Sequence, residues 1–283
     1  MNTTQIGWIG LGKMGIPMVQ NLIKATYPVM VYNRNHAKTE IFSTQGVQVA
    51  ESPAALFDSC DVVVLMIADD SAVEAVFNGL DGLFTSSATG KIIVNMSTVS
   101  PAISNKMALL CTERGNYYID APVSGSVKQA TDGSLVIMAG GAQVAFDHVK
   151  PIFDCLGKLA LHIGENGIGN TAKLAINTLL GFHAQGLAEA IVFAEKNGVK
   201  TKDLMELINN SALGNAFMKI KGEAILNDNY EAAFALKHIA KDLRLAKDEG
   251  LSSPLANTLF ESFQKAEADL GEEDIISIIK KLK

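Results

Sequence analysis

The chain has 283 residues, of which 48% are hydrophobic and 19% are charged. This length allows two domains of about 100–200 residues each. The formal net charge of -6 predicts no basic surface for a phosphate backbone, so we expect no nucleic-acid partner. No stretch reaches the roughly 18 uninterrupted apolar residues of a membrane span, so we expect no membrane association. The three cysteines and five histidines show no metal-ligand spacing, which predicts no metal site and a cytoplasmic location.

Short apolar runs alternate with helical stretches in the first part of the chain. The expected strands are Ile6–Ile9, Val29–Tyr32, residues 61–68, Lys91–Met96, Tyr117–Asp120 and Leu135–Ala139. Helices are expected over about residues 14–25 and 36–44, from a capping box of Ser71 and Glu74, and from Ser100-Pro101. This alternation predicts an α/β domain of Rossmann type, with a parallel, doubly wound sheet.

The pattern changes near residue 164. The segment His162–Gly169 is rich in glycine, and no convincing strand follows it. Residues 171–196 predict one long helix, apolar on nearly all sides and therefore expected to be buried. Further helices are expected over residues 202–209, 215–226, 236–249, 254–268 and 274–282. We therefore expect a dinucleotide-binding domain over residues 1–163 and an all-helical domain over residues 164–283.

A glycine-rich turn follows the first expected strand. It has the pattern GxGxxG and contains Gly10, Leu11, Gly12, Met14 and Gly15. Glycines in such a turn allow a tight bend, close approach of a pyrophosphate and close helix–strand packing, while the helix N-terminus faces the phosphates. An ordinary glycine-rich turn is the alternative, but the strand–turn–helix context favours dinucleotide binding.

The residues after the second expected strand indicate which dinucleotide is bound. An acidic residue there would hydrogen-bond the ribose 2′-hydroxyl of NAD. The strand is instead followed by Asn33, Arg34 and Asn35, with no carboxylate from Thr26 to Thr39. A guanidinium can clamp a 2′-phosphate, which favours NADP. The alternative is that Arg34 is a solvated surface charge and the cofactor is NAD.

Two polar features predict catalytic chemistry. Lys173 and Asn177 are four residues apart on the long expected helix and so share one face. An ammonium beside a carbonyl oxygen is a suitable general acid for its reduction, although a lysine near a helix start is more often simply solvated. The turn from Asp120 through Ser124, Gly125 and Ser126 offers hydroxyl and N–H groups to a carboxylate, or is a plain loop.

Five segments together resemble the β-hydroxyacid dehydrogenase family. They are the turn from Gly10 to Met18, Asn95 to Pro101, Asp120 to Gly133, Gly167-Ile-Gly169 with Lys173 and Asn177, and Phe234 to Leu243. The family includes 3-hydroxyisobutyrate dehydrogenase, tartronate semialdehyde reductase and glyoxylate/succinic semialdehyde reductase. The motifs follow the family's order and spacing over essentially the whole chain, so the resemblance is highly specific.

The resemblance implies a hydride transfer between a nicotinamide and a small carbonyl or hydroxy acid, in a cleft between the two domains. Lys173 would be the acid/base and Asn177 would hold the substrate, whose carboxylate would lie on Ser124 and Gly125 with Ser126 nearby. Further residues would contact or enclose the cofactor: Met66, Ile67, Thr98, Phe234, Lys241 and Asp242. Family members are usually dimers or tetramers built through the helical domain, so we expect a homodimer or homotetramer.

Within the family, the run Asn33-Arg34-Asn35 resembles the glyoxylate/succinic semialdehyde reductase branch. A small carboxylate-bearing aldehyde is therefore the expected substrate. Gln129 departs from that branch, which commonly has proline there, and the substrate loop could differ as a result. Two alternatives are an imine reductase and a non-catalytic NADP-binding interaction module. Both kinds of relative usually lose the lysine, so Lys173 counts against each.

Overall fold

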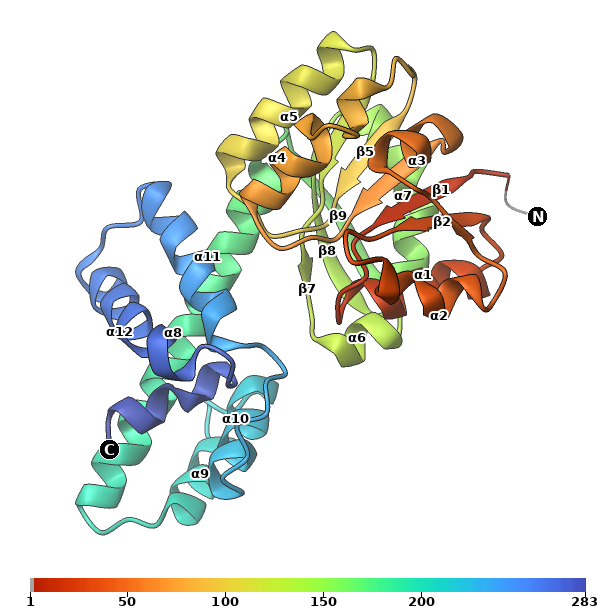
Figure 1. The fold of residues 1–283 in the computed structure, drawn as a ribbon. Coiled ribbons are helices and arrows are strands. Elements are labelled where there is room, and N and C mark those ends of the chain that lie inside the picture. The colour runs from red at the N-terminus through yellow and green to blue at the C-terminus, as the bar shows by residue number, and fades with distance from the viewer. Residues whose placement is uncertain (1–2) are drawn as a thin grey trace. The chain divides into compact units, whose positions relative to one another are not determined.

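The structure is a computed structural model that describes residues 3–283. Its contacts divide the chain into a compact unit that ends at Lys173 and a second one, Leu174–Lys283. Figure 1 shows strands and helices in the first unit and helices in the second. The boundary expected after residue 163 stays a prediction.

The described residues of the first unit, from Thr3 on, form a nine-stranded sheet. Its strands are β1 (Ile6–Ile9), β2 (Val29–Tyr32), β3 (Gln48–Val49), β4 (Val62–Leu65), β5 (Ile92–Asn95), β6 (Tyr117–Asp120), β7 (Val123–Ser124), β8 (Leu135–Gly141) and β9 (Gly157–Gly164). Their order is β3-β2-β1-β4-β5-β6-β8-β7, and β9 pairs with β8. The expected parallel pairing holds from β3 to β6 but is wrong for β8, which runs antiparallel to β6 and β7. The strand order reverses next to β1: β2 and β3 are added on one side of it, and β4 to β6 on the other. Open α/β sheets bind ligands at such a switch point.

Helices connect these strands. They are α1 (Gly15–Lys24), η1 (His36–Thr39), α2 (Glu40–Ser43), α3 (Pro53–Ser59), α4 (Asp70–Asn78), η2 (Leu83–Thr85), α5 (Pro101–Glu113), α6 (Val127–Thr131) and α7 (Gln143–Leu156). The start of α5 is confirmed, because the Ser100 side chain caps it and Pro101 lies in its first turn. The capping box of Ser71 and Glu74 is wrong, because α4 begins earlier and is capped by Asp69.

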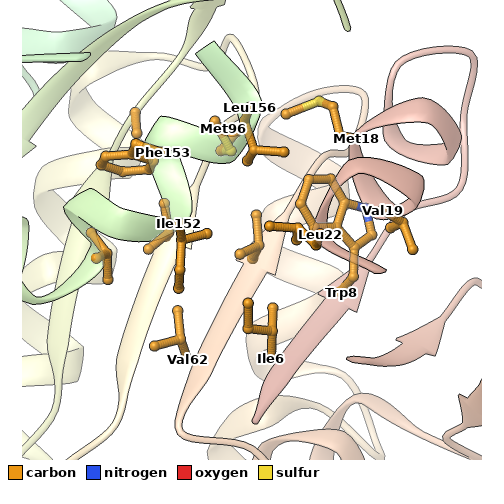
Figure 2. Packing of buried hydrophobic residues seen from close by; sticks show 14 of the residues in the cluster. Ile6, Trp8, Met18, Val19, Leu22, Val62, Met96, Ile152, Phe153 and Leu156 are labelled. Atoms are coloured by element: carbon orange, nitrogen blue, oxygen red, sulfur yellow. The ribbon is translucent and has the colours of Figure 1, made fainter. Parts of the chain in front are cut away.

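Hydrophobic cores lie on both faces of the sheet. In β4, Val62 and Val64 belong to one core, while Val63 and Leu65 belong to the other. The first core packs the sheet against α1 and α7, as Figure 2 shows for side chains such as Trp8. The second core packs it against α3, α4 and α5. Strands buried on both faces are read as continuous apolar runs, which is why the central strands were predicted from the sequence.

The second unit contains only helices. The helix α8 (Ile168–Lys196) begins in the first unit and continues into the second. It is followed by α9 (Thr201–Asn209), α10 (Ala216–Leu226), α11 (Leu236–Asp248), α12 (Pro254–Leu270) and η3 (Ile275–Lys281). The last segment is a 3₁₀ helix, within the range expected to be helical. Over residues 3–283, no helix is both long enough and apolar enough to cross a bilayer.

The expectation that α8 is buried on all sides is wrong for this single chain. Ile176, Leu179 and Phe193 are 41%, 55% and 70% exposed, respectively. Their spacings of 3 and 14 residues place them along one face of the helix. The opposite face, with Ala184, Leu187 and Ile191 among others, belongs to the core of the second unit.

Candidate active and cofactor site

Hydrogen bonds to the end of β2 and to a side chain of β1 hold the glycine-rich turn between β1 and α1 in place. The backbone N–H of Gly10 donates to the carbonyl of Tyr32, 3.0 Å away, and Gly10 has a φ of +107°. The indole Nε1 of Trp8 donates to the Gly10 carbonyl at 3.0 Å. The N-cap residue Met14 makes no side-chain hydrogen bond to the N-terminus of α1, so the first turn offers backbone N–H groups of the kind that bind phosphate.

The three glycines of this turn meet different surroundings. A Cβ at Gly10 would lie 2.2 Å from the Met66 carbonyl oxygen, and one at Gly15 would lie 2.1 Å from that of Gly10. A Cβ at Gly12 would meet no atom of residues 3–283 within 4 Å, its two chain neighbours aside. Gly10 and Gly15 are therefore needed for packing within the protein, while the side of Gly12 is open. This arrangement fits a pyrophosphate that approaches the backbone at Gly12.

The three residues after β2 have separate roles. The Asn33 side chain accepts a hydrogen bond from the Leu11 N–H at 2.8 Å and donates to the Asn35 carbonyl, so it ties the turn to this loop. The Asn35 side chain caps η1. Arg34 is exposed, and its guanidinium makes no hydrogen bond or ion pair to any residue of the range 3–283. Arg34 is therefore the cationic group available to an anionic ligand in this loop.

Hydrogen bonds join the segments that follow β4 and β5, at the carboxyl ends of these neighbouring strands. The Met66 N–H donates to the Ile9 carbonyl at 2.9 Å, and the Ile67 N–H donates to Oγ of Ser97 at 2.9 Å. Thr98 follows Ser97 and is partly buried. The predicted contacts Met66, Ile67 and Thr98 therefore lie on segments that are joined to each other and, through Met66, to the glycine-rich turn.

The expected substrate turn is shaped by local hydrogen bonds. Gly125 has a φ of +143°, and a Cβ there would lie 2.7 Å from Leu135 and 2.9 Å from Gln129. Oε1 of Gln129 accepts hydrogen bonds from both the N–H and the hydroxyl of Ser126, at 2.8 and 2.7 Å. Gln129, the departure noted in the sequence, thus closes a capping box at the start of α6. The Ser126 hydroxyl proton is used in this contact, whereas Ser124 is half-buried at the end of β7.

A buried carboxylate holds the start of α8. Asp120 is 0% exposed, and its two oxygens accept hydrogen bonds from the N–H groups of Gly167 and Asn170, at 2.7 and 2.8 Å. Burial raises the pKa of Asp120 to about 6, although these N–H donors favour the charged form. The Asn170 side chain accepts from the Val99 N–H and donates to Oγ of Ser104.

Lys173 lies in the second turn of α8, three residues after Asn170, and is 7% exposed. A solvated lysine, the simple alternative, is therefore not what the structure shows. Lysines are seldom buried without a specific role or partner.

Three predicted residues meet in the second unit. Nδ2 of Asn177 donates to Oδ2 of Asp242 at 2.5 Å, and both residues are buried. Nζ of Lys241 lies 3.1 Å from Oδ1 of Asp242. Oδ1 of Asp242 accepts no hydrogen bond of good geometry from residues 3–283. Its contact with Lys241 is therefore an ion pair. Phe234 precedes α11, and its ring stacks on His238 with the centroids 6.1 Å apart.

Sequence reasoning missed Asn170 and assigned no role to the Asp120 side chain. A carboxylate at the end of an otherwise apolar strand was the available signal for Asp120. Asn170 had no such signal, because its partners Val99 and Ser104 are 71 and 66 residues away in the sequence.

Two family models together match nearly the whole chain. One, described as the NAD binding domain of 6-phosphogluconate dehydrogenase, matches residues 5–164. The other, described as NAD-binding of NADP-dependent 3-hydroxyisobutyrate dehydrogenase, matches residues 167–282. The chain therefore has an NAD(P) cofactor, in agreement with the open side of Gly12.

Individual relatives match over the same length. The chain is 34% identical to glyoxylate/succinic semialdehyde reductase 1 of Arabidopsis thaliana, over 99% of this chain and 98% of that protein. It is 35% identical to 2-(hydroxymethyl)glutarate dehydrogenase of Eubacterium barkeri, over 98% and 94%. The solved structure of Mycobacterium tuberculosis 3-hydroxyisobutyrate dehydrogenase with L-serine superposes with a TM-score of 0.90 at 27% identity, over 100% of both chains.

Proposed function

We propose that this chain, which belongs to the β-hydroxyacid dehydrogenase family, reduces a small carboxylate-bearing aldehyde with NADPH. Glyoxylate and succinic semialdehyde are the first substrates to test, because a similar protein is named for both. The observation that carries the proposal is the buried Lys173, one helical turn before the buried Asn177 on α8.

The chemistry needs one proton from the protein. The bound nicotinamide supplies a hydride to the carbonyl carbon. As that C–H bond forms, the electron pair of the C=O π bond moves to the oxygen, and Nζ of Lys173 donates the proton that makes it a hydroxyl group. Lys173 is then neutral and regains a proton from water. In the reverse direction, the neutral amine accepts the hydroxyl proton.

The preference for NADP rests on Arg34. Its guanidinium has no partner among residues 3–283, and it follows the strand whose end faces the adenosine ribose in dinucleotide-binding folds. A guanidinium makes charge-assisted hydrogen bonds to a phosphate. Asn33 and Asn35 use their side chains to shape the loop that presents it.

We place the substrate carboxylate at Ser124 and Gly125. The positive φ of Gly125 turns the backbone sharply after β7, and a turn of this kind can direct N–H groups at an anion. The Ser124 hydroxyl is half-buried, so it can donate to the same carboxylate. Ser126 contributes by holding the turn through Gln129 rather than by donating its own proton.

We also propose that the chain is a homo-oligomer, a dimer or tetramer in which a second copy covers the exposed face of α8. Ile176, Leu179 and Phe193 form an apolar stripe along that face. A stripe of this kind on a long helix is suited to an isologous contact with the same stripe of another copy. Sedimentation of Phe193→Asp tests this: a shift toward monomer supports the contact, and an unchanged assembly contradicts it.

The proposed location is the cytoplasm. Cys60, Cys111 and Cys155 are all free, as expected in a reducing compartment. Burial raises the pKa of Cys60 and of Cys111 to about 12, so neither is a reactive thiolate at neutral pH. Fluorescence microscopy of the tagged protein tests this location.

Absorbance of NADPH, and separately of NADH, tests the proposed activity. The panel contains glyoxylate, succinic semialdehyde, tartronate semialdehyde and methylmalonate semialdehyde, with oxidation of 2-(hydroxymethyl)glutarate by NADP⁺ as the reverse assay. We expect at least one aldehyde to oxidise NADPH well above NADH. If the whole panel is silent while NADPH still binds, the proposed substrate class is wrong, and imines become the next substrates to test.

A further inference from the structure

Asp120 carries a buried negative charge that no cation of residues 3–283 balances through an ion pair. An isolated buried carboxylate is costly, and packing alone would be served better by an apolar side chain. Its two oxygens accept hydrogen bonds from the N–H groups of Gly167 and Asn170, at the start of the 29-residue helix α8. A negative charge at a helix N-terminus is favoured by the helix dipole. The carboxylate of Asp120 therefore stabilises the N-terminus of α8, the helix that carries Lys173.

The carboxylate is also confined from the sides. A Cβ at Gly140 would lie 2.8 Å from Oδ1 of Asp120, and one at Gly169 would lie 2.8 Å from Oδ2. Backbone therefore approaches each oxygen closely enough to exclude a side chain. Because β6 anchors Asp120 in the sheet through its pairing with β5, the first turn of α8 is anchored to the sheet as well.

A buried hydrogen-bond network extends this anchor to the predicted cofactor segments. Asn170 joins the first turn of α8 to Val99 and Ser104, at 3.0 and 3.1 Å. On the neighbouring strands, the Tyr118 hydroxyl accepts from Nδ2 of Asn95, whose Oδ1 accepts from the Ser97 N–H. Thr98 lies between Ser97 and Val99, so hydrogen bonds hold the backbone N–H groups of both its neighbours.

We infer that Asp120 is a positioning residue of the reductase: by holding the first turn of α8, its carboxylate sets the position from which Lys173 donates its proton. Lys173 follows Asn170 by three residues, less than one turn of a helix. A displacement of about 1 Å at a reacting group can lower a rate by about 100-fold. Only a carboxylate offers acceptors to both N–H groups, because an amide in its place turns a donor toward one of them. The inference rests on the proposed function.

A double-mutant cycle with Lys173 tests this role. Asp120→Asn is made in the natural chain and in Lys173→Ala, and kcat, KM and the NADPH dissociation constant are measured for each. In the natural chain we expect kcat to fall about 10-fold or more, with NADPH binding changed less than about 2-fold. In Lys173→Ala, the same change should lower kcat less than about 2-fold, because the group that Asp120 positions is absent. An equal loss in both backgrounds overturns the inference.

A second readout does not depend on the low activity of Lys173→Ala. If proton donation is slowed, the solvent deuterium isotope effect on kcat should be larger in Asp120→Asn than in the natural chain. A lower kcat with an unchanged isotope effect contradicts the positioning role. If Asp120→Asn does not fold, Asp120→Ser enters the same cycle, because it removes the carboxylate and leaves a smaller hydroxyl with a single acceptor oxygen near the two N–H groups.

Ser52→Ala is the control for general destabilisation. The Ser52 side chain caps α3 by accepting from the Ala55 N–H at 3.1 Å, and loss of such a cap costs about 1 kcal/mol. We expect its kcat to be unchanged. A natural chain that reduces no aldehyde of the panel would contradict the proposed function and this inference with it. An active natural chain with additive losses contradicts the inference alone.

Discussion

The side-chain amide of Asn177 donates a hydrogen bond to the carboxylate of Asp242 over 2.5 Å, and both groups are buried in the second unit. This bond joins α8, which carries Lys173, to α11, which carries Lys241. It also fixes the orientation of the amide, because the nitrogen of Asn177 faces the carboxylate. Asp242 therefore determines the orientation of the Asn177 side-chain amide.

Asp242→Ala should destabilise the protein, because it leaves the buried amide nitrogen of Asn177 without this acceptor. The expected loss is about 1–3 kcal/mol in the free energy of unfolding, measured by urea denaturation. Asp242→Asn should cost less, since its amide oxygen can still accept the bond. Equal stability of Asp242→Ala and the natural chain would show that the bond contributes nothing.

Lys173→Ala should lower kcat about 10²–10⁴-fold, because general acid catalysis is lost, while the NADPH dissociation constant is retained. Steady-state kinetics with the best aldehyde of the panel measure the change. The exposed Lys196 at the end of the same helix provides the control, and Lys196→Ala should be fully active. Full activity of Lys173→Ala would refute the acid/base assignment.

Arg34→Ala should weaken NADPH binding about 10- to 100-fold and leave NADH nearly unchanged, because only NADPH has a 2′-phosphate. This range corresponds to the roughly 1.5–3 kcal/mol of a charge-assisted hydrogen bond. Fluorescence titration with each cofactor measures it. Arg114→Ala is the matched control, since Arg114 stacks over Phe84. An equal loss for both cofactors would show that Arg34 does not contact the phosphate.

Alanine at Gly12 and alanine at Gly10 should have different effects. Gly12→Ala meets no atom of residues 3–283 within 4 Å, its two chain neighbours aside, so we expect little change in stability but at least about 10-fold weaker NADPH binding, because the methyl group enters the space for the pyrophosphate. Gly10→Ala should destabilise the fold by about 1–3 kcal/mol or more, given its φ of +107° and the nearby Met66 carbonyl. Thermal unfolding and NADPH titration of both variants distinguish the two effects. Unchanged NADPH affinity in Gly12→Ala would place the cofactor elsewhere.

The raised pKa of Asp120 predicts a pH dependence of stability. Burial raises this pKa from 3.8 to about 6, so between these values the folded state binds more protons than the unfolded state. Stability from Asp120 is then fully present below pH 3.8 and is lost as the pH rises through about 6. The natural chain should lose at most roughly 3 kcal/mol relative to Asp120→Asn over this range. Urea denaturation of both proteins from pH 4 to pH 7 measures the difference, and a constant difference would contradict the raised pKa.

Local sequence patterns determined the central strands and the glycine-rich turn. β1, β2 and β6 have the expected bounds, because strands buried on both faces appear as short apolar runs between turns. The turn after β1 was predictable because its three glycines lie within six residues of one another in the sequence. Ser100-Pro101 also marked the start of α5 correctly, because a cap is a contact over three residues.

The missed elements have weaker local signals. β3 and β7 have two residues each, and β9 contains the exposed residues Lys158, Leu159 and Leu161, so none shows a continuous apolar run. α7 contains Pro151 in its interior, a residue that normally counts against a helix. α3 had a usable signal, Ser52 before Pro53.

The sequence by itself determined the Rossmann-type α/β fold, the helical second half and the motifs of the family, because each is encoded in patterns a few residues long. Only the tertiary structure decided what holds those residues. Asp120 meets Gly167 and Asn170 across 47 and 50 residues of sequence, and Asn177 meets Asp242 across 65. Such pairings depend on how strands and helices pack, and a buried polar group takes whichever partner the packing brings within hydrogen-bond distance.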